Sequence, residues 1–216
     1  MRYKNLTIIG TSHISKDSVK EVEENILEIK PEIIAIELDP LRFRNLQKQK
    51  GKVKGLSPKM HLLNLIGSYI EKKLGKYTKS APGSEMKKAI QLAKKHKIKI
   101  SLIDQDIRIT LKKLIKQITF KEKLRFIADL FKGMILRKSD IRFDIRKVPS
   151  QKIINKILKK VKKRYPSVYN VLIKERNEIM AKNLKTLMHK YKDEQIIAVV
   201  GAGHEQAIIN IIKKDV

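Results

Sequence analysis

Four short apolar segments rich in β-branched residues constrain the fold of this chain more than any other feature of its sequence. They occupy residues 4–10 (KNLTIIG), 32–38 (EIIAIEL), 98–103 (IKISLI) and 195–200 (QIIAVV). Runs of this length and composition are typical of buried strands. Amphipathic helical stretches at 16–30 and 84–97 separate them. Because strands that alternate with helices favour a parallel sheet, we predict an α/β fold with flanking helices.

A strongly basic stretch lies between the third and fourth predicted strands. From Ile107 to Lys174 it carries 21 Lys and Arg residues and four acidic residues. Its apolar residues keep helical spacing over 110–163, which predicts helix throughout. We therefore divide the chain into a first part of the α/β core, a basic helical insertion and a closing part with the last helix, strand and turn, at residues 1–106, 107–169 and 170–216. One more helix is expected around residues 60–74.

The composition excludes several kinds of site. The chain contains no Cys, so disulfides, thiolate nucleophiles and Cys-ligated zinc are excluded. Any metal would be bound by His, Asp or Glu. The sequence shows neither a signal peptide nor an apolar run near the ~20 residues that cross a bilayer. We expect a cytoplasmic protein with no transmembrane segment.

The net charge of +28 makes nucleic acid or another acidic partner a candidate ligand. The candidate contacts in the insertion are Lys159, Lys160, Lys162 and Lys163. Few aromatic residues are interleaved with the lysines, and no known nucleic-acid module is visible. Lysine enrichment of the thermophile type explains the charge equally well, so both explanations stay open.

Ionisable side chains follow all four predicted strands. In chain order they are His13, Glu37, Asp39, Asp104, Asp106 and His204. In parallel α/β sheets, ligands bind at the carboxyl ends of the strands. We therefore expect these residues near one edge of the sheet.

Two of these residues lie in similar turns. The turns are Gly10-Thr11-Ser12-His13 and Gly201-Ala202-Gly203-His204, and each follows an apolar strand and precedes a helix. Small residues let the backbone turn sharply and let a ligand approach closely. One Gly-x-x-His turn is weak evidence, since a structural histidine is common. Two matched turns on the same sheet favour a functional site.

Three further side chains are candidates for the same site. Glu37 follows a run that should be buried, where a carboxylate needs a cation, a metal or a function. Arg176 lies on the apolar stripe of the last long helix, with Asn177 beside it. An inward-facing Arg needs a carboxylate or an anionic ligand. The alternative is that its stem packs while its head reaches water.

Local structural roles compete for the remaining acidic residues. Asp39 precedes Pro40 and is expected to form a turn. Asp104 and Asp106 either belong to the site or cap the following helix. Glu85 either belongs to the site or favours the start of its own helix through the helix dipole.

Six motifs, taken together and in this order, resemble the TraB domain family. They are GTSHIS (10–15), IELDPLR (36–42), GSEMKKAI (83–90), LIDQDIRITL (102–111), ERNEIMA (175–181) and VVGAGH (199–204). The family includes pheromone shutdown proteins. It is related to TIKI-type metalloproteases and, more distantly, to erythromycin esterase-like and ChaN-like proteins.

The resemblance implies an erythromycin esterase/ChaN-like fold and a single pocket. This pocket would contain the two Gly-x-x-His turns, Glu37, Arg176 and Asn177. The residues that match the middle motifs with less defined roles are Glu85, Asp104, Asp106 and Arg108. Family members often have Ala at position 12 and an acidic residue at position 177. Many relatives continue into a C-terminal membrane region, and that membrane role is not expected to carry over.

Two functions follow from these residues. The favoured one is a metal-dependent hydrolase, such as a peptidase, in which His13, His204 and Glu37 bind Zn, Mn or Co. Arg176 would stabilise a developing oxyanion and Asn177 would orient the substrate. A metal-free variant would use a His as general base. The alternative is a non-catalytic protein that binds a peptide, an acidic partner or nucleic acid. The substrate and any oligomer formation stay open.

Overall fold

The computed structural model describes residues 1–12, 16–47, 83–136 and 150–214. Its strands are β1 (Arg2–Tyr3), β2 (Leu6–Thr11), β3 (Ile33–Ile36), β4 (Lys99–Leu102) and β5 (Ile196–Gly201). They form one sheet in the order β1-β2-β5-β3-β4. All neighbours pair in parallel except β1, which pairs antiparallel with β2. The predicted α/β fold with a mainly parallel sheet is confirmed.

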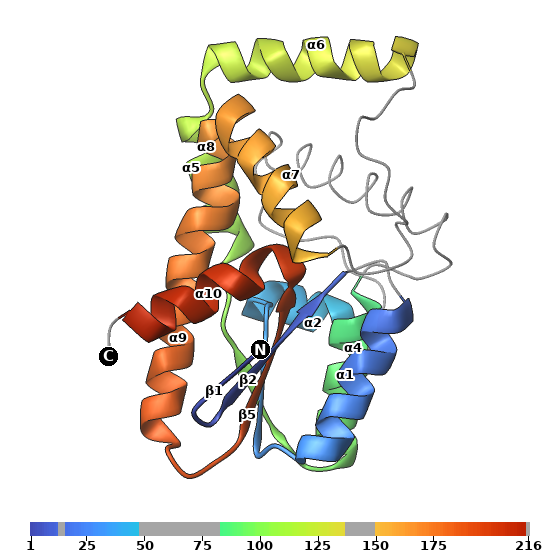
Figure 1. Cartoon of the computed structure of the whole chain (residues 1–216), viewed down its shortest axis with the longest axis vertical. Helices are drawn as coiled ribbons and strands as arrows, with labels where there is room; N and C mark the ends of the chain where they lie inside the picture. The colour runs from blue at the N-terminus through green and yellow to red at the C-terminus, as the bar shows by residue number, and fades with distance from the viewer. Residues whose placement is uncertain (13–15, 48–82, 137–149, 215–216) are drawn as a thin grey trace.

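Helices surround this sheet and extend beyond one end of it (Figure 1). They are α1 (Lys16–Ile29), α2 (Pro40–Gln47), α4 (Ser84–Lys95), α5 (Ile107–Gln117), α6 (Phe120–Leu136), α7 (Gln151–Arg164), α8 (Pro166–Tyr169), α9 (Glu175–Lys190) and α10 (Ala202–Lys214). A five-residue π-helix, η1 (Asn170–Lys174), joins α8 to α9.

The two faces of the sheet carry separate apolar cores. Met180 and Leu184 of α9 pack with Ile208 of α10 and with residues such as Ile8 on one face. Residues of α1 and α4, including Val22, Ile26, Met86 and Ile90, pack on the other face. Because both faces are covered, β3 and β5 are apolar at almost every position, as a buried parallel strand requires.

The basic insertion is helical, but it is not one continuous helix. Helices α5, α6, α7 and α8 lie between β4 and α9, with a break between α5 and α6 at residues 118–119. Helix α6 crosses the top of the molecule, away from the sheet (Figure 1). The remaining part of this stretch, residues 137–149, lies outside the described residues, as does the helix expected around 60–74.

Three local features differ from the expectations. Strand β1 was not predicted, because two residues give no periodicity. The Asp39-Pro40 pair begins helix α2, since the Asp39 carboxylate accepts bonds from the amides of Leu41 and Arg42 at 2.8 and 3.1 Å. The last long helix is preceded by the π-turn η1, which the helical apolar spacing does not reveal.

Candidate functional site

The strand order brings the predicted site residues to one edge of the sheet. In the β2–β5 ladder Thr11 pairs with Gly201, so the two Gly-x-x-His turns leave neighbouring strands at the same level. Strand β3 lies on the other side of β5 and ends directly before Glu37. His13 itself lies outside the described residues. The backbone up to Ser12 therefore leads toward the edge where His204 stands.

Arg176, in the first turn of α9, is the central cation of this edge. Its Nη2 donates to Glu37 Oε1 and, at 2.6 Å, to Asp104 Oδ2. Its Nε donates to Asp104 Oδ1 at 3.0 Å. The side chain is 14% exposed, and the Glu37 and Asp104 side chains are 4% and 0% exposed. Arg176 therefore faces inward, and two buried carboxylates meet its need for acceptors.

The environment keeps Arg176 charged. Burial alone would lower the pKa of its guanidinium, but the charges and hydrogen bonds of Glu37 and Asp104 outweigh burial and raise that pKa. The π-turn η1 contributes a further acceptor, because Nη1 donates to the carbonyl oxygen of Leu172 at 3.3 Å. Interruptions of this kind in a helix often occur at functional sites.

Glu37 links this cation to the second Gly-x-x-His turn. Its Oε2 accepts a hydrogen bond from the Gly201 amide at 2.6 Å, while Oε1 faces Arg176. Gly201 is the last residue of β5 and the first residue of the turn that carries His204. The carboxylate thus joins the end of β3 to the end of β5.

Asn177 orients the imidazole of His204. Asn177 Oδ1 lies 2.6 Å from His204 Nδ1, and both residues are buried. On the other side of the ring, Nε2 lies 3.4 Å from Arg176 Nη1 and 3.6 Å from Glu37 Oε1. Since an Arg can only donate, the assigned tautomer has its proton on Nδ1, donated to Asn177, and a lone pair on Nε2.

A second arginine, for which the sequence predicts no role, belongs to the cluster. Arg42 of α2 donates through Nη2 to Asp104 and through Nε to Asp39 Oδ2 at 2.5 Å. Burial lowers the pKa of Arg42, but attraction to Asp104 and the bond to Asp39 reverse this, and the pKa is raised. Asp39 thus caps α2 and holds Arg42 against Asp104. The sequence signals for Arg42 are its position three residues after Asp39 and its place at the end of the IELDPLR motif.

The remaining acidic candidates lie in different places. Asp106 caps α5 by accepting from the Arg108 amide at 2.8 Å, and the Arg108 side chain folds back onto it. Bonds from Arg108 lower the pKa of this Asp106 carboxyl. The capping alternative therefore holds for Asp106, with Arg108 as its local partner. Glu85 is fully buried in the first turn of α4.

The two Gly-x-x-His turns use their glycines differently. A Cβ on Gly10 would lie 2.3 Å from Glu205 Oε2, so the residue after His204 packs against the backbone of the first turn. A Cβ on Gly203 would meet no atom of the described residues within 4 Å. A side chain at position 10 would therefore displace the Glu205 carboxylate, whereas the described residues leave space beside Gly203.

His204 and Glu37 are the two described side chains closest to the geometry of a pair of metal ligands. Among the described ranges, no group of three or more His, Asp or Glu side chains is placed to hold an ion. The separation of 3.6 Å between His204 Nε2 and Glu37 Oε1 lets both atoms reach one ion at about 2.0–2.2 Å. The Asn177 bond to Nδ1 is the kind of support that a metal-binding His receives. The distance between these two donor atoms is compatible with a shared divalent ion.

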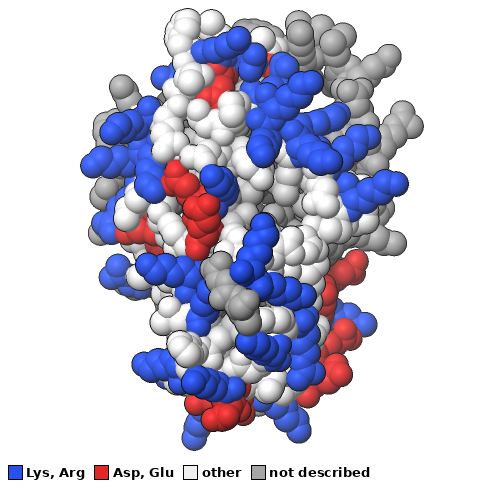
Figure 2. All heavy atoms as spheres, turned by 60° about the vertical axis from the view of Figure 1, so that its left-hand side comes forward, with Lys and Arg blue, Asp and Glu red and all other residues white. Residues whose placement is uncertain are grey.

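On the face shown in Figure 2, Lys and Arg side chains extend from top to bottom and do not gather in one basic patch. The lysines proposed for nucleic acid all lie exposed on α7, namely Lys159, Lys160, Lys162 and Lys163. Neither the geometry nor the charge of these lysines singles out an acidic partner, so their role stays a prediction.

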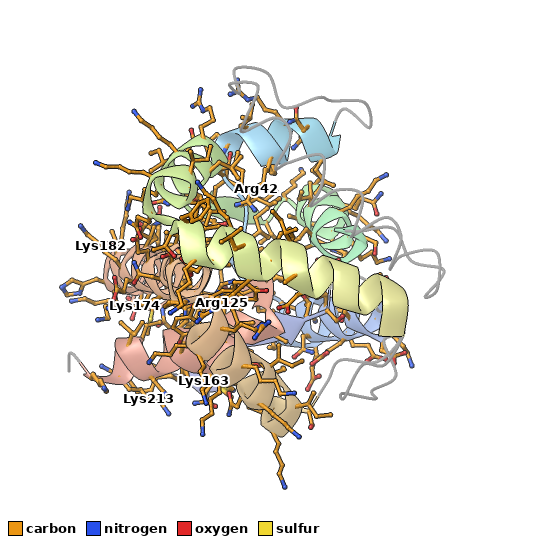
Figure 3. All side chains as sticks on the ribbon, turned by 90° about the horizontal axis from the view of Figure 1, so that it is seen from above. Arg42, Arg125, Lys163, Lys174, Lys182 and Lys213 are labelled. Atoms are coloured by element: carbon orange, nitrogen blue, oxygen red, sulfur yellow. The ribbon has the colours of Figure 1, made fainter. Side chains whose placement is uncertain are left out.

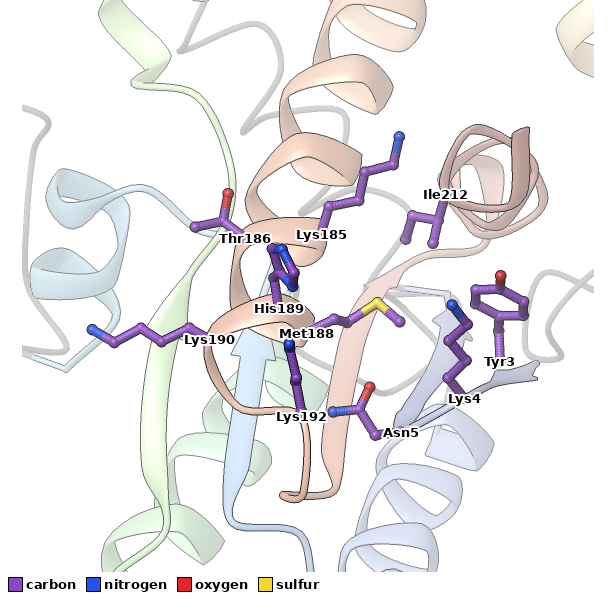
Figure 4. Close-up of a pocket in the computed structure, with 10 residues that line it drawn as sticks. All are labelled: Tyr3, Lys4, Asn5, Lys185, Thr186, Met188, His189, Lys190, Lys192 and Ile212. Atoms are coloured by element: carbon purple, nitrogen blue, oxygen red, sulfur yellow. The ribbon is translucent and has the colours of Figure 1, made fainter. Parts of the chain in front are cut away.

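A hollow of about 1100 Å³ lies at the opposite edge of the sheet (Figure 4). It is formed by the β1–β2 turn, the end of α9 and α10, and is lined by Tyr3, Lys4, Asn5, Lys185, Thr186, Met188, His189, Lys190, Lys192 and Ile212. Along α9, Met188 is roughly 18 Å from Arg176. The hollow is therefore separate from the His204 site.

Comparison with known proteins agrees with the motifs. The TraB/PrgY/gumN family model matches residues 2–214. An uncharacterized protein of Methanocaldococcus jannaschii is 40% identical over 97% of this chain and 54% of its own length. TraB domain-containing proteins of Homo sapiens and Mus musculus are 23% and 22% identical, over 93% of this chain and 61% of their own lengths. The chain thus spans between half and two thirds of these relatives.

Proposed function

Because the chain belongs to the TraB/PrgY/gumN family, we propose that the His204 edge is the active site of a metal-dependent hydrolase that acts on peptides or small molecules. The observation that carries the proposal is the orientation of His204. Asn177 holds its Nδ1, and Nε2 faces Glu37 Oε1 within a buried cluster. A ring fixed in this way, with the Nε2 lone pair between Arg176 and Glu37, suits either a metal ligand or a general base.

In the metal-dependent form, the ion is held by His204, Glu37 and His13. A bound divalent ion would acidify a water molecule and polarise a carbonyl group. The lack of Cys leaves zinc, manganese or cobalt as suitable ions for such a set of ligands. Asn177 holds Nδ1 of His204, which would leave Nε2 available to bind such an ion.

Arg176 has a structural and an electrostatic role in this scheme. All of its N–H groups point at acceptors: those of Nε and Nη2 at Glu37 and Asp104, and those of Nη1 at Leu172 and His204. The Nη1 contact to His204, at 3.4 Å, is the longest of these. Nη1 is therefore the donor that would turn toward a developing oxyanion, while the rest of the fork holds Glu37 in place.

A metal-free hydrolase is the second candidate, and one specific observation favours it. Arg176 pairs with Glu37, and both Arg176 and Arg42 pair with Asp104, so each carboxylate already has a guanidinium partner without an ion. His204 Nε2 would then act as the general base, with Asn177 fixing the proton on Nδ1.

The test combines metal binding with hydrolysis. The protein, freed of metal by chelation, is titrated with Mn²⁺, Co²⁺ and Zn²⁺ in a calorimeter, and hydrolysis is followed with fluorogenic peptides. His204→Ala and His13→Ala should each lower metal affinity at least tenfold. His96→Ala removes an exposed histidine at the end of α4 and serves as the matched control.

The outcomes separate the two forms. Hydrolysis that stops on chelation and returns with the ion supports the metal-dependent form. Hydrolysis that survives chelation but is lost in His204→Ala supports the general-base form. A chain that binds no ion and shows unchanged hydrolysis in both His variants would refute the proposal.

A further inference from the structure

Helix α6 is attached to the rest of the protein by its polar side. Glu122 accepts bonds from the Thr119 amide at 3.0 Å and the Ser167 amide at 2.8 Å. Arg125 donates to the Arg164 carbonyl, and Asp129 receives the guanidinium of Arg164. In the view from above, Arg125 lies between α6 and the ribbon of α7 (Figure 3). The only two acidic residues of α6 therefore face the body of the protein.

The opposite side of α6 is apolar and exposed. Phe120 is 74% exposed, Leu124 is 52% and Ile127 is 49%. At ~100° per residue these positions fall within roughly 60° of arc, so they form one stripe. Lys121 and Lys123, both exposed, fall on either side of that stripe. The helix thus reverses the usual arrangement, in which the apolar face packs on the core and the polar face meets water.

The surroundings of the stripe restrict what can cover it. Besides Lys121 and Lys123, the insertion presents exposed Lys162 and Lys163 near the end of α7. A second copy would bring two strongly basic surfaces together, which like-charge repulsion opposes. Duplex nucleic acid would match the charge, but its stacked bases leave little apolar surface for the aliphatic side chains of the stripe. The partner must combine an apolar layer with negative charge.

Because an exposed apolar stripe with flanking lysines needs such a partner, we propose that α6 docks the protein on an anionic lipid surface. An amphipathic helix with large apolar residues on one face and flanking lysines lies in the plane of such a surface. The apolar side chains enter the boundary between headgroups and acyl chains, while the lysine heads extend to the phosphates. Among the described helices none is long and apolar enough to cross a membrane, so this contact would be peripheral. The inference does not depend on the proposed hydrolase.

Vesicle flotation tests the docking. The full chain is mixed with phosphatidylcholine vesicles or with vesicles of equal parts phosphatidylcholine and phosphatidylglycerol. We expect binding to the anionic vesicles only. Leu124→Ser/Ile127→Ser should weaken it at least tenfold, since each buried aliphatic side chain contributes to insertion. Leu27→Ser is the matched control, because Leu27 of α1 is a Leu of similar exposure, at 46%.

A fluorescent reporter gives a second readout. The chain contains no Trp, so Phe120→Trp places a single reporter at the most exposed position of the stripe. Its emission should shift to the blue with anionic vesicles, as the ring leaves water, and should stay unchanged with phosphatidylcholine alone. Lys121→Gln/Lys123→Gln should reduce the shift, whereas Lys94→Gln/Lys95→Gln on α4 should not.

Several results would overturn the proposal. Equal vesicle binding by the Leu124→Ser/Ile127→Ser variant would show that the stripe does not insert. A reporter shift that depends on protein concentration without vesicles would identify a second copy as the occupant. Binding of an oligonucleotide with no vesicle binding would assign the surface to nucleic acid. Circular dichroism of each variant confirms that it is folded before the comparison is made.

Discussion

Replacing Arg176 with Met tests whether this side chain is the cation that allows two carboxylates to be buried. Met has a similar length and keeps the packing of the stem, but it removes every bond to Glu37 and Asp104. Asp104 keeps its bonds from Arg42 and the Gln105 amide. Glu37 keeps the bond from the Gly201 amide but loses its guanidinium. Glu37 is therefore the residue that loses its bond to a guanidinium, whereas Asp104 keeps one.

The expected destabilisation is large. Removing one partner of a buried ion pair costs about 3–5 kcal/mol, because the other charge stays buried. Since Asp104 retains Arg42, we expect a value near the lower end, about 3 kcal/mol. A chain of this size loses about 2–4 °C in Tm per kcal/mol, so Tm should fall by roughly 6–12 °C.

Thermal unfolding followed by circular dichroism measures this loss. The double variant Arg176→Met/Glu37→Gln removes the carboxylate charge as well, and should recover part of the stability. Arg108→Met is the matched control, since it removes an exposed Arg paired with Asp106 and should leave Tm near that of the parent. A loss below about 1 kcal/mol, or a double variant no more stable than Arg176→Met, would refute the reasoning.

Three further predictions concern the turns and α6. Gly203→Ala should raise the free energy of unfolding by about 0.5–1 kcal/mol, because Ala favours a helix over Gly and the added methyl group meets no described atom within 4 Å. The same substitution should lower hydrolysis if this space admits substrate. Gly10→Ala should lower the free energy of unfolding by about 1 kcal/mol, because the Glu205 side chain must move. Urea unfolding measures this free energy for both variants. Burial raises the pKa of Glu122, but bonds from Thr119 and Ser167 outweigh it and lower that pKa. The stabilisation is thus present above the unfolded pKa near ~4.3 and is lost as pH falls through the folded pKa. Glu122→Gln should therefore be less stable than the parent at pH ~6, with a gap that closes below pH ~4; a gap independent of pH would contradict this.

The sequence predicted the sheet and the strand-end residues because these depend on local patterns. A parallel strand buried on both faces must be a continuous apolar run, so the residue at which the strand ends can be identified from the sequence. The topology of parallel strands then carries Glu37 and His204 to one edge. Arg176 was predicted to need a carboxylate if it faced inward, and Glu37 and Asp104 supply it.

Other features depend on contacts between distant residues, which periodicity does not encode. Arg42 gains its role from Asp104, 62 positions away. The pairing of Asn177 with His204 likewise joins residues 27 positions apart. For α6, the sequence shows an amphipathic helix but not which of its faces meets the rest of the protein. That orientation depends on Arg164 of α7 and Ser167 of α8, which bind Asp129 and Glu122.

The formal charge of the buried cluster favours a cationic ligand. Counted as ionised, the cluster has three carboxylates and two guanidiniums, from Glu37, Asp39, Asp104, Arg42 and Arg176. With a neutral His204 it carries one net negative charge, within a chain whose net charge is +28. A divalent ion would reverse the sign of that charge, whereas an anion would add to it. Burial strengthens the effect, because charges in the interior are screened less than charges at the surface. The cluster should therefore bind Mn²⁺ or Zn²⁺ in preference to phosphate, although phosphate would be attracted to the rest of the surface.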